Sequence, residues 1–263
     1  MSDSGPGAAL DDHMRACFDP LLLDRIGSEL TLSGGRTDFR EVPDRVLMIL
    51  FASRAGSTYA GHLLANTHHF QRVAESFNPP QLHKIRVDQE LADDGEALRW
   101  MIANRGTAQA FAAKCGEPGL ASAWHLGFLN AVIDRVTFVL LKRRDVVAQA
   151  VSLFRAELSG RFHSPQKASQ QVRADQYDRE KIAVRLLIIE QVYESLVRFL
   201  TLTGKAYRTV YYEDICTDPA AFVRTTCMDL DLAPPDEFDG TVRLEILRDE
   251  INGEWIDRFR GGM

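Results

Sequence analysis

Short apolar runs alternate with helical patterns along most of this chain. Residues 46–52 (VLMILFA) form a continuous apolar run, which is typical of a strand buried in a parallel sheet, and a helical stretch follows through Ala65. Further strands are expected at 108–115, 136–141 (VTFVLL) and 207–212. Further helices are expected at 121–132, 145–158, 178–203 and 219–228. Strands that alternate with helices in this way predict an α/β fold with a central parallel sheet and helices on both faces.

The chain shows no internal repeat and no low-complexity linker, so we expect a single α/β domain over residues 45–263. Residues 1–44 form an N-terminal extension. Its first part, residues 1–9, is rich in Gly, Ser, Pro and Ala and is expected to be disordered. A short helical lead-in follows and contains a break at Ser33, Gly34 and Gly35.

Composition narrows the class of protein. The chain has 263 residues and a net charge of −6 spread along the sequence, which argues against a nucleic-acid surface, so the positive potential around any anionic ligand must be local. No apolar run reaches membrane-spanning length and the N-terminus lacks signal-peptide features, so we expect a cytoplasmic protein without an integral membrane segment. The widely spaced cysteines indicate reduced, buried thiols rather than a zinc or redox site: Cys17, Cys115, Cys216 and Cys227.

The first candidate site is the turn SRAGST at residues 53–58, between the first strand and its helix. Such a turn points several backbone N–H groups and a helix N-terminus at one place, which suits a phosphate or sulfate group. Gly56 permits close approach of the backbone, Ser57 and Thr58 add hydroxyl donors, and Arg54 adds a cation. The alternative is purely structural, with Ser57 capping the helix and Gly56 making the turn.

This turn differs from the phosphate loop of nucleotide kinases, because no lysine precedes its hydroxyl residues. Phosphoryl transfer usually requires Mg²⁺ to neutralise the charge of the transferred group. A sulfuryl group has one negative charge less, so one cation and a set of N–H donors suffice without metal. Arg54 is then expected to neutralise the charge that develops on the leaving phosphate oxygen.

The second candidate site follows the strand at 136–141. Arg143, Arg144 and Asp145 end this strand, and Ser152 lies eight positions after Arg144 on the next helix. The strand-end arginine and the helix serine could converge on one anion. In the alternative interpretation Asp145 caps the helix, the arginines lie in solvent and Ser152 lies on a helix face.

Taken together, these two segments resemble the PAPS-dependent sulfotransferases, where PAPS is 3′-phosphoadenosine-5′-phosphosulfate. The resemblance runs from Val46 to Phe259 and is greatest to the bacterial trehalose sulfotransferase branch, in RRDVVAQAVSLFRAELSGRFH and in the later VYYEDICTDP and NGEWIDRF. It implies a P-loop-like domain in which the first turn binds the 5′-phosphosulfate, through Arg54, Ala55, Gly56, Ser57 and Thr58. It also implies that Arg144 and Ser152 bind the 3′-phosphate. The chain departs from the usual turn at Ser53, where a proline is common, and at Ala55, where a serine is common.

The third candidate is Glu75, in HHFQRVAESFNPP. A sugar hydroxyl is a poor nucleophile, so transfer benefits from a base that accepts its proton. The resemblance to the trehalose branch implies that Glu75, followed by Ser76 and Phe77, is this general base. His68 and His69 are the rival candidates, since other sulfotransferases use histidine.

Several other side chains could reach the ligands but have equally plausible structural roles. Tyr59 could stack on adenine or lie in the core, and Lys114 and His163 could reach the acceptor or face solvent. A C-terminal segment could cover the nucleotide and contains Trp255, Arg258 and Arg260.

The sequence therefore predicts a doubly wound domain that binds PAPS at the ends of its parallel strands. No metal is expected. The acceptor is expected to be a small molecule, a sugar or glycolipid, and the resemblance implies a homodimer. Two rivals remain: a Mg²⁺-dependent, kinase-like phosphotransferase, and a non-catalytic nucleotide-binding protein.

Overall fold

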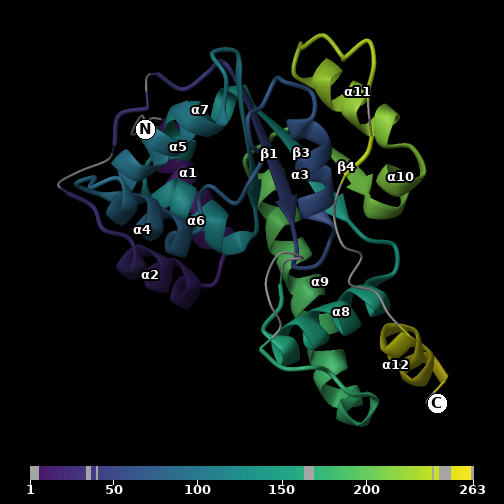
Figure 1. Ribbon diagram of the computed structural model, residues 1–263. Helices are drawn as coiled ribbons and strands as arrows, with labels where there is room; N and C mark the ends of the chain where they lie inside the picture. The colour runs from purple at the N-terminus through teal and green to yellow at the C-terminus, as the bar shows by residue number, and fades with distance from the viewer. Residues whose placement is uncertain are drawn as a thin grey trace.

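The computed structural model describes residues 6–33, 37–39, 41–162, 169–238, 240–242 and 250–261. Within these ranges the sheet has four strands, all parallel, in the order β2-β1-β3-β4 (Figure 1). The strands are β1 (Arg45–Phe51), β2 (Ala110–Cys115), β3 (Val136–Lys142) and β4 (Tyr207–Tyr211). The predicted parallel α/β fold is confirmed. Among the residues discussed above, Gly34, Gly35 and His163 lie outside the described ranges.

The continuous apolar run of β1 follows from its place between β2 and β3. Side chains on both of its faces are covered, so every residue from Val46 to Phe51 is buried. Val46, Met48 and Leu50 belong to the core on one face, and Leu47, Ile49 and Phe51 belong to the core on the other.

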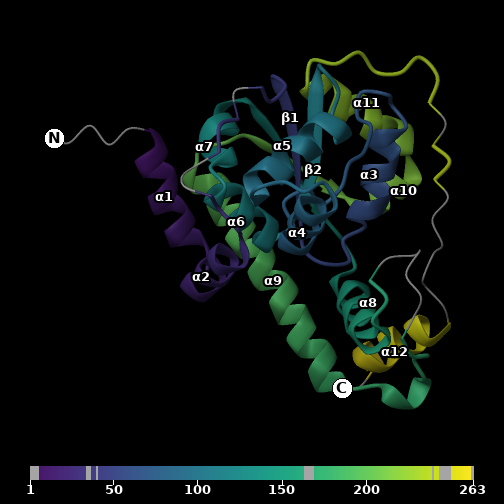
Figure 2. The same cartoon turned by 60° about the vertical axis from the view of Figure 1, so that its left-hand side comes forward.

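Helices cover both faces of the sheet, as predicted (Figures 1 and 2). The first face packs against these helices: α1 (Pro6–Cys17), α2 (Pro20–Glu29), α6 (Glu117–His125), α7 (Phe128–Val132), α8 (Val146–Ser159) and α9 (Arg179–Leu202). The second face packs against α3 (Ser57–Ala65), α10 (Tyr212–Thr217) and α11 (Pro219–Asp229). Figure 2 shows the length of α9, which runs past the sheet to lie beside α8.

Some local expectations were wrong. The single helix expected over 121–132 is two, because Gly127 has φ 81° and ends the first of them. Residues 6–9 belong to α1, so this part of the segment expected to be disordered is helical. Four helices were not anticipated: α4 (Pro79–Asp88), α5 (Asp94–Arg105), α10 (Tyr212–Thr217) and α12 (Glu250–Gly261). In α5 the buried face includes Asp94 and Arg105, so charged residues stand at positions where an amphipathic helix usually has apolar ones.

The cysteines agree with the expectation except at one position. All four thiols are free, and Cys17, Cys115 and Cys227 are buried, whereas Cys216 is exposed. None of the helices that the structure describes is both long and apolar enough to cross a membrane.

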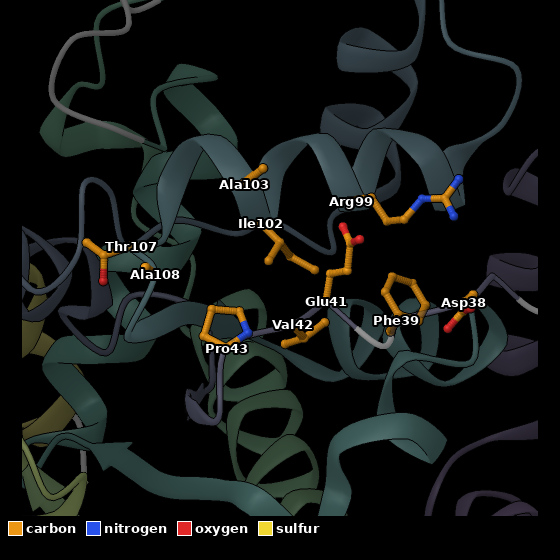
Figure 3. A pocket seen from close by; sticks show the side chains of 10 residues that line it. All are labelled: Asp38, Phe39, Glu41, Val42, Pro43, Arg99, Ile102, Ala103, Thr107 and Ala108. Carbon is orange, nitrogen blue, oxygen red and sulfur yellow. The ribbon is translucent and has the colours of Figure 1, made fainter.

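The two ends of the sheet differ in character. The candidate residues gather at the carboxyl ends of the strands, where β1 leads into α3 and β3 leads into α8. A cavity of about 620 Å³ lies at the opposite end, between the chain entering β1, the helix α5 and the chain entering β2. Figure 3 shows Phe39, Val42 and Ile102 among the side chains that line it. This cavity is therefore separate from the site described next.

Candidate active site

The turn after β1 has the backbone conformation of an anion-binding loop. Arg54 and Gly56 both have left-handed backbone conformations, with φ 65° and 90°, and the Ala55 N–H bonds the Ala52 carbonyl at 3.2 Å. Left-handed residues at alternate positions of a turn bring successive N–H groups into one concavity. Glycine is required at position 56 for two reasons. Its φ is positive, and a Cβ there would overlap the ring of Tyr212.

The structure excludes Ser57 as the cap of α3. Gly56, not Ser57, is the N-cap residue, and no side chain caps this helix. The first N–H groups of α3 therefore depend on another partner, and an anion is a suitable one. Ala55 is fully buried, and its side chain packs into the core on the second face of the sheet. The serine common at this position elsewhere would direct its hydroxyl into that core.

Arg54 and Ser152 are brought together across the site. The Arg54 Nε donates to Ser152 Oγ at 3.0 Å, and Nη1 of the same guanidinium donates to the Phe162 carbonyl. Burial lowers the pKa of Arg54, and the neighbouring charge of Arg143 lowers it further. The predicted turn and the predicted helix serine thus belong to one site, and Arg54 joins them.

Arg144 points away from this junction. Its guanidinium makes a two-bond pair with the Asp214 carboxylate, at 2.6 and 2.8 Å, and lies 4.3 Å from the centre of the Tyr211 ring. Its side chain is about half exposed. The expected convergence of Arg144 and Ser152 is therefore not made by a direct contact, because the Ser152 hydroxyl accepts from Arg54 instead.

Arg143, its neighbour, faces the turn; the sequence placed it in the second candidate site but gave it no contact with the turn. Only 8% of Arg143 is exposed, and its Nη1 donates to the Arg54 carbonyl at 3.5 Å. The Nε lies 3.7 Å from the Glu213 carboxylate, and the guanidinium lies over the ring of Tyr212. Asp145 caps α8, as in the structural alternative, by accepting from the Ala148 N–H at 2.9 Å. Of the two consecutive arginines, one is buried beneath the turn and the other is at the surface.

Glu75 lies beside the end of β2. Ala74 forms a bridge with Ala113, and the Lys114 N–H donates to the Ala74 carbonyl at 2.9 Å, so this segment runs along the strand. The Lys114 Nζ lies 3.7 Å from Glu75 Oε1 and 3.3 Å from Thr58 Oγ1. The predicted base is thus connected to the predicted sulfate-binding turn through one lysine.

Lys114 is buried, which excludes the solvent-facing role left open for it. Only 6% of its side chain is exposed, against 27% of that of Glu75. Burial lowers the pKa of Lys114, and the charge of Glu75 opposes this effect. The only feature of the sequence that indicated Lys114 as a site residue was its position at the end of a predicted strand.

A buried arginine holds the Glu75 segment in place. Arg105, at the end of α5, donates to Ser76 Oγ at 3.0 Å and to Gln81 Oε1 at 3.2 Å. Burial and the charge of Arg72 lower the pKa of Arg105 to about 10. The residues on either side of Glu75 are therefore fixed by β2 and by α5, while its carboxylate remains partly exposed.

The two rival histidines lie elsewhere. A ring nitrogen of His69 bonds the Ala233 carbonyl at 2.8 Å, and His68 is exposed in a left-handed conformation with φ 61°. A third histidine, His62 on α3, was not considered in the sequence. It is exposed, and its pKa is lowered by partial burial and by the charges of Lys114 and Arg72.

The remaining candidates have structural contacts. Trp255 on α12 is fully buried against Phe154 and Tyr177, and Arg260 pairs with Asp145 at 2.8 Å. The helix α12 thus packs beside α8 (Figure 2). Tyr59 packs edge-on against Tyr212. Among the described residues, no group of three or more His, Cys, Asp or Glu side chains could hold a metal ion.

Comparisons with known proteins agree with this fold. Among solved structures, a sulfotransferase from Alicyclobacillus acidocaldarius is similar to this chain with a TM-score of 0.50 and 16% identity, over 83% of this chain and 92% of that one. The sulfotransferase domain of the Synechococcus PCC 7002 olefin synthase has a TM-score of 0.49 and 13% identity, over 87% and 91% of the two chains. At such identities the first similarity concerns the fold alone, and the second is too distant to support an argument. No curated protein matches the chain.

The family follows from the sequence match. The family model for Stf0 sulphotransferase matches residues 97–262, which is more than half of the chain, and this protein belongs to that family. The match includes Lys114 and the junction from Arg143 to Ser152, whereas the turn at 53–58 and Glu75 precede it. The resemblance to the sulfotransferases is confirmed, and sulfuryl transfer is supported as the general chemistry.

Proposed function

We propose that this protein is a PAPS-dependent sulfotransferase that sulfates a hydroxyl group of a small acceptor, a sugar or a glycolipid. The observation that supports this most directly is the hydrogen bond between Arg54 and Ser152, because it joins an anion-binding turn to the start of a second helix at the same edge of the sheet. A nucleotide with charged groups at both its 5′ and 3′ positions requires two anion subsites at a fixed separation.

On the donor side, the N–H groups of the turn bind the 5′-phosphosulfate together with Ser57 and Thr58. Ser152 and Arg144 bind the 3′-phosphate, and the released Asp214 carboxylate stays solvated because both partners are at the surface. Arg54 neutralises the charge that develops on the bridging oxygen as its bond to sulfur breaks. No step requires a metal ion, because the transferred group carries a single negative charge.

On the acceptor side, Glu75 accepts the proton of the attacking hydroxyl as the new S–O bond forms. The Lys114 ammonium contacts both this carboxylate and Thr58, so it orients the base relative to the transferring group. Its charge is also well placed to stabilise the sulfuryl oxygens in the transition state.

We also propose a cytoplasmic homodimer. The four free thiols fit a reducing compartment. An apolar stripe on α9 supplies a surface for a second copy, because Val184, Leu187 and Ile188 are 47%, 56% and 43% exposed at helical spacing. Light scattering of Leu187→Glu tests this surface: the wild type should be dimeric and the variant monomeric, and a monomeric wild type would refute it.

The experiment that tests the proposed function is thermal stabilisation by nucleotides. 3′,5′-ADP should raise the melting temperature without metal, and 5′-ADP and ATP should do so far less. Stabilisation by ATP that depends on Mg²⁺ would favour a kinase-like phosphotransferase instead. Stabilisation by 3′,5′-ADP without turnover, against a panel of sugars and glycolipids with labelled PAPS, would favour a non-catalytic nucleotide-binding protein.

A further inference from the structure

Helix α8 contacts the turn at two successive points. The side chain of Gln149 is fully buried, and its Nε2 donates to the Ser53 carbonyl at 2.8 Å. One turn further along the same helix, Ser152 Oγ accepts from the Arg54 Nε at 3.0 Å. The helix therefore holds the turn by its backbone through Gln149 and by a side chain through Ser152.

The carbonyl side of the turn lies on a layer of buried donors. Arg143 donates to the Arg54 carbonyl, next to the carbonyl that Gln149 binds. Tyr193 on α9 donates its hydroxyl to the Leu141 carbonyl at 3.0 Å. Burial raises the pKa of Tyr193 to about 12, while hydrogen bonds from Gln149 and from the Ala52 N–H oppose this shift. Gln149 is thus bonded to the turn and lies near Tyr193 of α9.

This layer fixes which way the turn faces. The carbonyls of residues 53 and 54 are bound from below, and the Ala55 N–H is bonded to the Ala52 carbonyl, so the N–H groups that face a ligand are those at the start of α3. Ser53 stands where a proline is common, and so lacks the fixed φ of that residue. The bond from Gln149 restrains the same position from outside the turn.

We propose that Gln149 is a positioning residue that sets the separation between the two anion subsites, one at the turn and one at Ser152. The inference rests on the proposed function. Gln149 itself touches neither anion. It joins the turn to the helix that presents Ser152, so a ligand with one anion gains little from it. A ligand with two anions gains selectivity, because the turn and Ser152 are already held at the correct distance from each other.

The test is a comparison of ligands in two Gln149 variants. Gln149→Met keeps the length of the side chain, and Gln149→Asn keeps an amide that is too short to reach the Ser53 carbonyl. Dissociation constants for 3′,5′-ADP and 5′-AMP are measured by calorimetry. We expect the preference for 3′,5′-ADP to fall roughly tenfold in both variants, the size of one lost buried hydrogen bond, while 5′-AMP binding changes little.

A matched control separates this effect from general destabilisation. Thr226 on α11 is also fully buried, and it bonds the Phe222 carbonyl and Arg208 next to the first residues of β4, at the other end of the sheet. Thr226→Val should lower the melting temperature without changing the preference. If both Gln149 variants kept the preference for 3′,5′-ADP over 5′-AMP, or bound both ligands equally more weakly, the role of Gln149 would be overturned and the proposed function would stand. A wild-type protein that does not prefer 3′,5′-ADP would overturn the proposed function as well.

Discussion

The proposed donor side and the proposed acceptor side of the site are built in different ways. On the donor side, the turn at 53–58 directly follows the buried strand β1. Ser152 lies on the second turn of α8, the helix that follows the buried strand β3. On the acceptor side, Glu75 lies on an irregular segment that is held by a bridge to β2 and by Arg105 from α5. The donor side is thus defined by short local patterns, whereas the acceptor side depends on contacts between distant parts of the chain.

The charged side chains of the two sides also differ. Arg54 and Arg143 lie close enough on the donor side for each charge to oppose the other, and such a site favours a ligand with negative charge. On the acceptor side Glu75 and Lys114 already form a pair. Changes on the donor side should therefore alter nucleotide affinity as well as rate, and changes on the acceptor side should alter rate alone.

The largest effect is expected at Glu75. Glu75→Gln keeps the shape of the side chain and removes its basicity, so turnover should fall by roughly 100- to 10,000-fold. Binding of 3′,5′-ADP should be nearly unchanged, because the carboxylate faces the acceptor. Steady-state rates with a sugar or glycolipid acceptor, together with calorimetry, measure both quantities. His68→Ala and His69→Ala are the controls and should remain active; an inactive histidine variant beside an active Glu75→Gln protein would identify that histidine as the base.

Arg54 should show the next largest loss of rate. Arg54→Ala removes the cation that meets charge appearing only in the transition state, so turnover should fall by about 100- to 1,000-fold. Affinity for 3′,5′-ADP should fall much less. Arg54→Lys keeps the charge but loses the bond to Ser152, so its turnover should lie between that of the wild type and that of Arg54→Ala. Near-normal turnover of Arg54→Ala would show that the arginine serves only to hold the nucleotide.

Arg144 tests whether a surface arginine belongs to the donor side. Arg144→Ala should weaken 3′,5′-ADP binding by roughly 30-fold, as expected when one partner of a charged pair is removed. The melting temperature of the free protein should hardly change, because exposed ion pairs contribute little. Arg173 is the matched control, since it makes a similar exposed two-bond pair with Asp175. Equal nucleotide affinity in wild type, Arg144→Ala and Arg173→Ala would show that Arg144 does not bind the nucleotide.

The smallest effect is expected at Lys114. Lys114→Met keeps an unbranched side chain in a buried position and leaves Glu75 without its cation, so turnover should fall roughly tenfold with unchanged 3′,5′-ADP affinity. Lys84→Met is the control, because Lys84 pairs with Asp88 on an exposed face of α4. If Lys114→Met weakened nucleotide binding more than turnover, the lysine would belong to the donor side through Thr58.

The sequence by itself determined the parallel sheet and the edge at which the turn at 53–58 and Ser152 meet. The apolar runs of β1 and β3 predict buried parallel strands, and the residues that follow a parallel strand reach a common edge of the sheet. The position of the turn at 53–58 and of Ser152 along the chain therefore sufficed to predict that they share this edge. Glu75 was found only through the resemblance to a family, since an isolated glutamate has no pattern of its own.

The tertiary structure alone decided which of two neighbouring side chains faces the site. Arg143 and Arg144 are identical in type and adjacent in sequence, yet one is buried under the turn and the other pairs with Asp214 at the surface. The direction of each depends on how the chain leaves β3 and on where Glu213 and Asp214 lie at the end of β4. The same holds for Gln149 and Lys114, whose partners are far away along the chain. A local sequence pattern specifies which residues form a strand or a turn, whereas the partner of a buried polar side chain is set only when the separate elements pack together.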